Sequence, residues 1–192
     1  MKKILIGTHN KGKFREIAYL LSNKSKKISP TSLKIPSPKE TGKTFLANSK
    51  LKAEYFSKFV NYPVISDDSG LCIRFMKNKP GIFSARLAKK KGGFQKAMKF
   101  ILKKMKNTKN RSAYFICSLS FKYPKKRVVT CTGKIQGTIS LKISGKKGFG
   151  YDPIFIPQSY KKTFSEISKL KKMRIDHRFL AFKKLKNKIK TL

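Results

Sequence analysis

Acidic side chains are what this sequence has least of. Its 192 residues include 8 Asp and Glu against 48 Lys and Arg, which gives a formal net charge of +40. The acids are Glu16, Glu40, Glu54, Asp67, Asp68, Asp152, Glu166 and Asp176. In a chain so poor in acids, each of them is a stronger candidate for a function than it would be in an acidic chain.

Long apolar runs and paired cysteines are also lacking. No stretch is long enough to span a membrane, and the apolar run of residues 4–6 is too short for a secretory signal. The three cysteines, Cys72, Cys117 and Cys131, are odd in number and do not have the spacing of a metal site. We therefore expect buried free thiols in a cytoplasmic protein without a membrane segment.

The excess of positive charge allows two interpretations. Clustered cations are typical of nucleic-acid binders, which gain affinity by releasing the counterions of phosphates. Here 41 of the 48 cations are lysines, and they are spread from Lys2 to Lys190, whereas geometric recognition of phosphate or guanine favours Arg. The pattern favours the drift of an A/T-rich genome and no specific nucleic-acid partner, although the field should still attract anions such as nucleotides.

Hydrophobic periodicity predicts a mixed α/β domain over residues 1–192, with 15 Phe and 7 Tyr available for its core. The expected strands cover residues 4–6, 64–65, 71–73, 112–121, 127–132 and 134–143. The expected helices cover residues 14–21, 44–58, 94–105 and 176–189, and residues 80–91 and 145–152 are expected to be loops. Hairpin links between the middle strands predict a mixed sheet with flanking helices rather than a purely parallel sheet.

The first candidate site is the turn Gly7-Thr8-His9-Asn10-Lys11-Gly12-Lys13, which follows a predicted strand and begins a helix. It nearly matches the phosphate-binding motif G-x-x-x-x-G-K-[ST], but Phe14 stands where a hydroxyl would hold Mg²⁺. A strict P-loop is therefore not expected. A strand–helix turn still offers backbone N–H groups and Lys13 to a phosphate, and the alternative is an ordinary capped turn.

The second candidate is the acidic pair in Ser66-Asp67-Asp68-Ser69-Gly70, directly after a predicted strand. Two adjacent carboxylates are not easily buried together, because like charges disfavour ionisation. A divalent cation resolves that conflict, and Mg²⁺ commonly takes one or two carboxylates together with substrate phosphates. One carboxylate could instead act as a general base toward water. The alternative without function is an Asx-turn before Gly70.

The third candidate is the glycine-rich loop of residues 145–153. Its glycines would let the backbone approach a ligand closely. Phe149 and Tyr151 could stack on a base, and Asp152 could accept a proton from a base or a ribose. The alternative is a β-turn with packed aromatic rings.

The fourth candidate combines Lys172 with His177 and Arg178, which follow a predicted helix N-cap at Asp176. Cations in the first turn of a helix oppose the helix dipole. Their presence there suggests an anionic or carbonyl-rich ligand, and the alternative is a basic turn on the surface.

Together these segments resemble the Ham1/ITPase family of inosine/xanthosine triphosphate pyrophosphatases, in order and over almost the whole chain. The matching blocks are Thr8-x-Asn10-x-x-Lys13-x-x-Glu16, Glu40-Thr41-Gly42-x-Thr44-Phe45 with Asn48 and Lys52-Ala53, Ser66-Asp67-Asp68-Ser69-Gly70-Leu71, Pro80-Gly81-Ile82-Phe83-Ser84-Ala85-Arg86, Gly148-Phe149-Gly150-Tyr151-Asp152-Pro153-Ile154-Phe155 and His177-Arg178. Each block alone is moderately specific, but all of them in order at family spacing are very specific.

The resemblance implies a Mg²⁺-dependent hydrolase that converts ITP, dITP and XTP to the monophosphate and pyrophosphate, which keeps deaminated purines out of DNA and RNA. It implies an elongated mixed sheet with flanking helices, in two lobes around a deep central cleft, and a homodimer. By position, Glu40 and Asp68 would hold Mg²⁺, and Asp68 would accept a proton from water. The implied substrate-binding residues are Thr8, His9, Asn10, Lys11, Gly12, Lys13, Ser69, Phe149, Gly150, Tyr151, Asp152, Lys172, His177 and Arg178.

The chain departs from the family pattern at Asp176, where Ser is usual, and at Phe179, where Gly is usual. Basic stretches at residues 89–91 and 169–172 replace acidic or partly acidic ones. These departures concern base selectivity and lobe closure, and the predicted phosphate and metal positions are intact. The alternatives are a related nucleotide pyrophosphatase with another base preference and a basic nucleic-acid binder without catalysis, which would not explain the aspartate pair.

Overall fold

The computed structural model describes residues 2–21 and 23–189. Its strands are β1 (Lys2–Gly7), β2 (Ser25–Ile28), β3 (Val64–Ile73), β4 (Lys79–Pro80), β5 (Ser112–Lys122), β6 (Val129–Ile139) and β7 (Phe155–Pro157). Its helices are α1 (Lys11–Leu20), α2 (Phe45–Ser57), α3 (Ser84–Lys90), α4 (Phe94–Lys104), α5 (Lys169–Met173) and α6 (His177–Lys188). Short 3-10 turns are η1 (Thr31–Leu33), η2 (Arg74–Met76), η3 (Gly81–Phe83) and η4 (Asp152–Ile154).

The strands of the described residues form one seven-stranded sheet in the order β2-β1-β3-β5-β6-β7, with β4 paired to β3. β1 runs parallel to β2 and β3, whereas β3 with β4 and β6 with β7 pair antiparallel. The predicted mixed sheet with flanking helices is therefore confirmed. Within residues 2–21 and 23–189, no helix is long and apolar enough to cross a membrane.

The chain divides into two compact units, and strands β3, β5 and β6 contribute to both. The first unit holds the residues up to 68, residues 117–133 and the residues from 178 onward. The second unit holds residues 69–116 and 134–177. The chain changes unit between Asp68 and Ser69 and between His177 and Arg178, so two adjacent pairs of predicted site residues are divided between the units.

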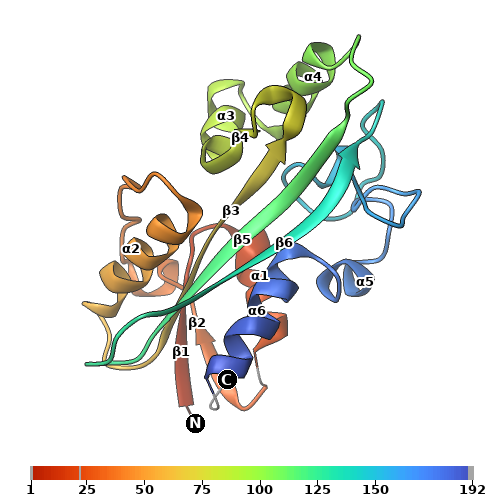
Figure 1. The fold of residues 1–192 in the computed structure, drawn as a ribbon. Helices are drawn as coiled ribbons and strands as arrows, with labels where there is room; N and C mark the ends of the chain where they lie inside the picture. Colours follow the sequence, from red (N-terminus) through yellow and green to blue (C-terminus); the bar gives the residue numbers. More distant parts are fainter. Residues whose placement is uncertain (1, 22, 190–192) are drawn as a thin grey trace. The chain divides into compact units, whose positions relative to one another are not determined.

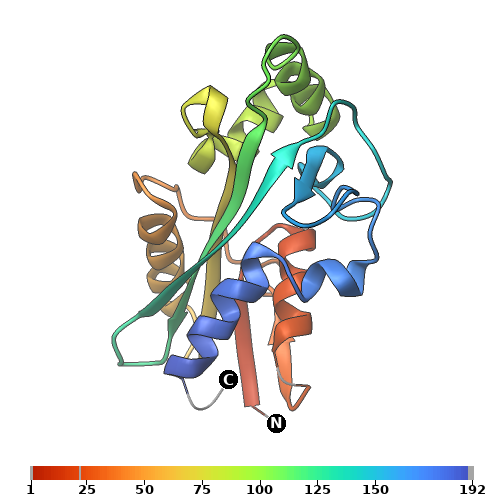
Figure 2. The same cartoon turned by 45° about the vertical axis from the view of Figure 1, so that its right-hand side comes forward.

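In the first unit, helices cover both faces of the sheet. α1 and α6 lie on one face and α2 lies on the other (Figure 1 and Figure 2). Ile4 and Ile6 of β1 belong to the buried cluster that contains residues of α1 and α6, whereas Leu5 between them packs with Phe56 of α2. Successive residues of a strand point to opposite faces, so the buried residues of β1 pack alternately toward α1 and α6 and toward α2.

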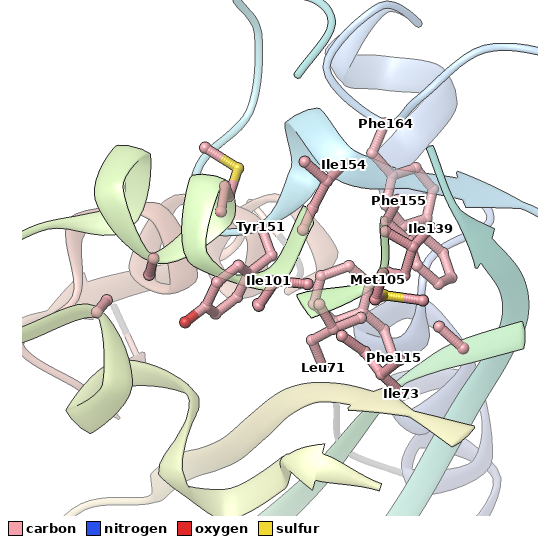
Figure 3. Packing of buried hydrophobic residues seen from close by; sticks show 14 of the residues in the cluster. Leu71, Ile73, Ile101, Met105, Phe115, Ile139, Tyr151, Ile154, Phe155 and Phe164 are labelled. Atoms are coloured by element: carbon pink, nitrogen blue, oxygen red, sulfur yellow. The ribbon is translucent and has the colours of Figure 1, made fainter. Parts of the chain in front are cut away.

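The core of the second unit gathers around α4, which confirms the helix predicted over residues 94–105. Figure 3 shows Ile101 of α4 and Met105 at its C-terminal end beside Leu71 and Ile73 of β3 and Phe115 of β5. None of these five side chains is more than 6% exposed. Each contributes about 2 kcal/mol through burial, so the cluster fixes the parts of β3 and β5 that belong to this unit.

Several segments differ from the sequence prediction. The expected loop over residues 80–91 contains helix α3, whose short apolar side, with Ala88 only 3% exposed, is followed by exposed lysines. The strands expected over residues 127–132 and 134–143 are the single strand β6, which passes through Gly133 without a break. Helix α5 and strand β7 were not predicted, because elements of 5 and 3 residues are too short to show a period.

The buried side of α2 mixes polar and apolar residues. The buried residues are Asn48, Ser49, Lys52, Ala53 and Phe56. Ser49 Oγ lies 2.8 Å from Ser120 Oγ of β5, and both residues are 0% exposed. The helix therefore contacts the sheet through hydroxyl groups as well as through apolar residues such as Phe56.

The charge of the chain predicts a fold that is destabilised by its own cations. Residues 69–151 contain 22 Lys and Arg and no acid. We expect the midpoint of thermal unfolding to rise by about 5 °C when NaCl is raised from about 10 mM to about 300 mM, because salt screens this repulsion. Circular dichroism melting curves would measure the shift, with sucrose at equal osmolarity as the uncharged control. A midpoint that falls or stays constant with NaCl would contradict the prediction.

Candidate active site

The aspartate pair lies inside β3, at the point where the neighbouring strand stops. β1 ends at Gly7, which pairs with Ser66, and the chain then turns into α1. Because β3 continues to Ile73, Asp67 and Asp68 come directly after the last residue that is paired with β1. The alternative of an Asx-turn is wrong, since both aspartates are strand residues, 0% and 4% exposed.

Asp67 meets cations from α1 and α6. Its Oδ2 lies 3.1 Å from Lys13 Nζ and 3.4 Å from Arg178 Nη2. Arg178 also forms a buried ion pair with Glu16 of α1. Burial alone would raise the pKa of Asp67, but the cations, Lys13 first and then Arg178, hold that pKa well below its usual range. Asp67 is therefore ionised, and side chains of the protein compensate its charge.

Asp68 points to the other face of the strand and meets α2. Its Oδ2 accepts a hydrogen bond from Asn48 Nδ2 at 3.0 Å. Burial raises the pKa of Asp68, and the nearby Glu40 carboxylate adds to that effect. The cations Lys13 and Lys52 and the bond from Asn48 lower the pKa but do not cancel the increase. Asp68 thus carries a charge that its surroundings compensate only in part.

Lys52 of α2 is attracted by the carboxylates of Glu40, Asp67 and Asp68. Its Nζ lies 2.8 Å from Glu40 Oε1. Burial would lower the pKa of this lysine, but the charges of Asp67, Glu40 and Asp68 outweigh burial and raise the pKa. The ammonium group of Lys52 is therefore attracted by three carboxylates, of which Asp67 is also compensated by Lys13 and Arg178.

The two aspartates have opposite surroundings, which shift the pKa values of their carboxyl groups in opposite directions. Neighbouring carboxylates whose pKa values are pushed apart are typical of sites where the two groups take different roles. The residues Glu40 and Asp68 fit Mg²⁺, because carboxylates suit a hard cation that binds few protein ligands and completes its shell with water and phosphate. Lys52 and Asn48 already contact these carboxylates and compensate their charge in part. In the part of the chain that the structure describes, no group of three or more His, Cys, Asp or Glu side chains could hold a metal by itself.

The turn after β1 caps α1, which is compatible both with the predicted phosphate site and with the alternative of an ordinary capped turn. Asn10 Oδ1 accepts the backbone N–H of Lys13 at 3.0 Å, and Thr8 Oγ1 accepts that of Asn10 at 3.2 Å. His9 Nε2 donates to the carbonyl oxygen of Ile35 at 3.0 Å. Lys11, Gly12 and Lys13 form the first turn of α1, which contains no acid, so the helix N-terminus can bind an anion. A cavity of about 450 Å³ is lined by Thr8, His9, Asn10, Lys11, Phe14 and Arg15, among others.

In the second unit, predicted base-binding residues gather around Lys172. Its Nζ lies 2.6 Å from Asp152 Oδ2 and 4.6 Å from the centroid of the Phe149 ring. The same carboxylate oxygen accepts the backbone N–H of Phe149 at 2.9 Å. Gly148 has φ +76°, and a Cβ there would lie 2.2 Å from that oxygen, so this loop requires glycine. The result is a buried ion pair with a cation over an aromatic ring.

The other predicted residues of this unit are partly structural. Tyr151 is 2% exposed, and its hydroxyl donates to the carbonyl oxygen of Ser84 at 3.0 Å, which anchors the glycine-rich loop to α3. The ring of His177 stacks on that of Phe115, with centroids 4.8 Å apart. The alternative of a basic surface turn is wrong, because His177 and Lys172 are buried. Partly exposed positions are Ser69 and Gly150.

Three residues of the first unit's cluster had no predicted role, namely Glu16, Asn48 and Lys52. All three are polar and at most 6% exposed. The sequence held a signal for two of them: Asn48 and Lys52 are four positions apart, so on a helix they point the same way. A helix that presents an amide and a lysine one turn apart, beside a block with Glu40, is a signal for a polar site.

Comparison with known proteins agrees with this arrangement. The model of the Ham1 family matches residues 4–188. The chain belongs to the Ham1 family. The resemblance inferred from the motifs is thereby confirmed, and the Ham1 blocks coincide with the clusters around Asp68 and Lys172.

Individual Ham1 relatives match over their full length. A dITP/XTP pyrophosphatase of Oceanobacillus iheyensis is 42% identical over 197 residues, which cover 100% of each chain. One from Dictyoglomus thermophilum is 42% identical over 189 residues, 95% of this chain and 92% of that one. The solved structure of the Staphylococcus aureus Ham1 protein has a TM-score of 0.86 at 34% identity and covers 98% of both chains.

Proposed function

We propose that this Ham1 protein is a nucleoside triphosphate pyrophosphatase that hydrolyses dITP, ITP and XTP to the monophosphate and pyrophosphate. The observation that carries the proposal is the contrast between the contacts of Asp67 and Asp68. The Asp67 carboxylate lies against Lys13 and Arg178, whereas the Asp68 carboxylate accepts a hydrogen bond from Asn48. The full-length relatives that bear the name dITP/XTP pyrophosphatase support the choice of substrate.

The phosphates would bind at the N-terminus of α1. Lys13 and the backbone N–H groups of that turn meet the negative charge. Glu40 and Asp68 are the residues that would hold Mg²⁺, which supplies positive charge to phosphate oxygens when it is bound. Lys52, already beside Glu40, keeps the carboxylates from repelling one another in the absence of substrate.

The chemical step is the attack of water on the α-phosphorus. The bond between that phosphorus and the oxygen that bridges to the β-phosphorus breaks, and pyrophosphate leaves with that oxygen. Asp68 would accept a proton from the attacking water, because an aspartate with a raised pKa is a stronger base than an ordinary one. Asp67 would stay ionised and position Lys13.

The base would bind at the second unit's cluster. Lys172 and His177 offer hydrogen-bond donors to the 6-keto oxygen of hypoxanthine or xanthine, and Phe149 offers a ring for stacking. Adenine carries an amine at that position and would leave the donors unpaired, which lowers its binding strongly. Arg178 acts in this proposal through its ion pairs with Glu16 and Asp67.

The deciding experiment is pyrophosphate release from dITP, XTP, ATP, GTP and dUTP, with Mg²⁺ and with EDTA. We expect release from dITP and XTP at least about 100-fold faster than from ATP, since unpaired donors penalise the amine, and no release with EDTA. Preferred hydrolysis of dUTP would instead favour the alternative base preference. Salt-dependent binding to DNA with no hydrolysis of any nucleotide would favour the non-catalytic alternative.

Two further properties of the proposal are predictions from the family resemblance. They are an elongated arrangement of two lobes around a deep central cleft and a homodimer. Sedimentation equilibrium at several protein concentrations would test the dimer, with a mass of twice 22.0 kDa as the expected result.

A further inference from the structure

We propose that Asn48 is a positioning residue, which holds Asp68 and the segment that carries Glu40 at a fixed separation. The proposal deepens the function proposed above and rests on it, because Glu40 and Asp68 are the assigned Mg²⁺ carboxylates. The side chain of Asn48 does not belong to that assigned set, and nothing requires it to touch substrate.

Both ends of the Asn48 amide bond to elements of the site. Nδ2 donates to Asp68 Oδ2 at 3.0 Å, and Oδ1 accepts the backbone N–H of Gly42 at 2.8 Å. The orientation of the amide is unambiguous, because a backbone N–H can only donate and an ionised carboxylate can only accept. One buried side chain, 0% exposed, thus joins β3 to the segment that begins at Glu40.

The contact between Gly42 and Asn48 requires a glycine at position 42. A Cβ at residue 42 would lie 2.6 Å from Asn48 Oδ1 and 2.9 Å from the backbone nitrogen of Asn48. Thr44 then caps α2 by accepting the N–H of Ala47 at 3.0 Å, which starts the helix and fixes the direction of Asn48. The Glu40-Thr41-Gly42-x-Thr44 block therefore builds a tight turn against the amide.

Lys52 completes the same arrangement one helical turn further along α2. It holds Glu40 Oε1 at 2.8 Å, while Asn48 holds the backbone two residues after Glu40 and the carboxylate of Asp68. Hydrophobic packing does not explain an amide at a fully buried position. Burying an amide costs free energy unless both of its ends form hydrogen bonds. Its placement points to a role in orienting the two carboxylates.

The consequence for Mg²⁺ is preorganisation. Partners that orient metal ligands through hydrogen bonds are worth about 10- to 100-fold in metal affinity or activity. Without Asn48, the Asp68 carboxylate can rotate and the Glu40 segment can move away from it. We therefore expect Mg²⁺ affinity and turnover to fall together, while the affinity for the base end of the nucleotide does not change.

The test compares Asn48→Ala with Ser49→Ala. Ser49 is the neighbouring residue on α2, is equally buried, and bonds to Ser120 rather than to the site. Binding of Mn²⁺ without nucleotide, followed by electron paramagnetic resonance, gives a readout that is independent of turnover. Asn48→Ala is expected to weaken Mn²⁺ binding and kcat about 10- to 100-fold, and to leave KM for dITP at saturating Mg²⁺ within about 3-fold. Ser49→Ala is expected to keep both values.

The outcomes separate this proposal from the proposed function. Wild-type Mn²⁺ affinity and kcat in folded Asn48→Ala would overturn the positioning role and leave the function intact. A wild-type protein that binds Mn²⁺ but hydrolyses no nucleotide would overturn the function, and weaker Mn²⁺ binding by the variant would still support the positioning role. A wild-type protein that binds Mn²⁺ neither alone nor together with a non-hydrolysable dITP analogue would overturn both. If Asn48→Ala does not fold, Asn48→Ser, which keeps one hydrogen-bonding group, is measured in the same way.

Discussion

An Asp68→Asn variant is expected to hydrolyse dITP about 1,000-fold more slowly than the wild type and to be no less stable. The loss of rate follows from removing both the proposed proton acceptor and a proposed Mg²⁺ carboxylate, and a general base alone typically contributes about 100- to 10,000-fold. Pyrophosphate release at saturating dITP and Mg²⁺ measures the rate. Urea unfolding in EDTA measures the free energy of unfolding without metal.

The stability of this variant follows from the sign of the pKa shift. Burial and Glu40 raise the pKa of Asp68 above its value in the unfolded chain. The ionised carboxylate therefore favours the unfolded state at neutral pH, and this cost disappears at pH values below the unfolded pKa of about 4. An amide has the same shape without the charge, so we expect the free energy of unfolding to stay equal or rise by about 1 kcal/mol.

Asp67→Asn is the matched control, one residue away in the same strand. Lys13 and Arg178 hold the pKa of Asp67 below its unfolded value, so this group stabilises the fold at neutral pH and loses that effect as the pH falls below about 4. We expect its loss to lower the free energy of unfolding by about 3 kcal/mol. Near-full activity of Asp68→Asn, or a shift of both variants in the same direction, would contradict the assigned roles.

The sequence was sufficient to predict the type of sheet and to single out the segments from which the active site is proposed. The polar turn before α1, the acidic pair and the glycine-rich loop are local signals, because each depends on residue types at short spacing. The mixed sheet followed from hairpin links between strands. What these signals share is that a few neighbouring residues determine them.

The different roles proposed for Asp67 and Asp68 could not be derived from sequence spacing alone. It depends on β3 running straight through the pair, so that alternation sends the two carboxylates to opposite faces. It also depends on Arg178, which reaches Asp67 across 111 positions of sequence. A tertiary contact of that length leaves no local pattern. Lys13 and Lys52 act on both aspartates, whereas Arg178 forms its ion pair with Asp67.

The buried side of α2 also depends on tertiary contacts. A helix that covers a polar site buries amide, hydroxyl and ammonium groups. The rule that apolar residues face the core therefore does not identify the whole buried side of such a helix. Lys52 is 6% exposed while Leu46 is 49% exposed. A buried lysine and an exposed leucine in the same helix are a signal for a site, because burying a lysine is unfavourable unless it pairs with carboxylates.

Arg178→Met is expected to lower the free energy of unfolding by about 4 kcal/mol, since removing one partner of a buried ion pair leaves the other charge uncompensated. The guanidinium is 1% exposed and contacts both Glu16 and Asp67, whereas Met fills a similar volume without charge. The midpoint of thermal unfolding should fall by about 10 °C for a chain of this length. Urea unfolding at pH 7 and differential scanning calorimetry would measure the two quantities.

The pH dependence and a second substitution separate lost charge from lost packing. Because the pKa of Asp67 is lowered in the folded protein, the stability that its ion pairs supply is complete above about pH 4 and is lost below it. The difference between the wild type and Arg178→Met should therefore narrow as the pH falls through that range. Adding Glu16→Gln to Arg178→Met should recover about 1 kcal/mol by removing one uncompensated carboxylate. A difference that is independent of pH, with no recovery in the double variant, would assign Arg178 to packing alone.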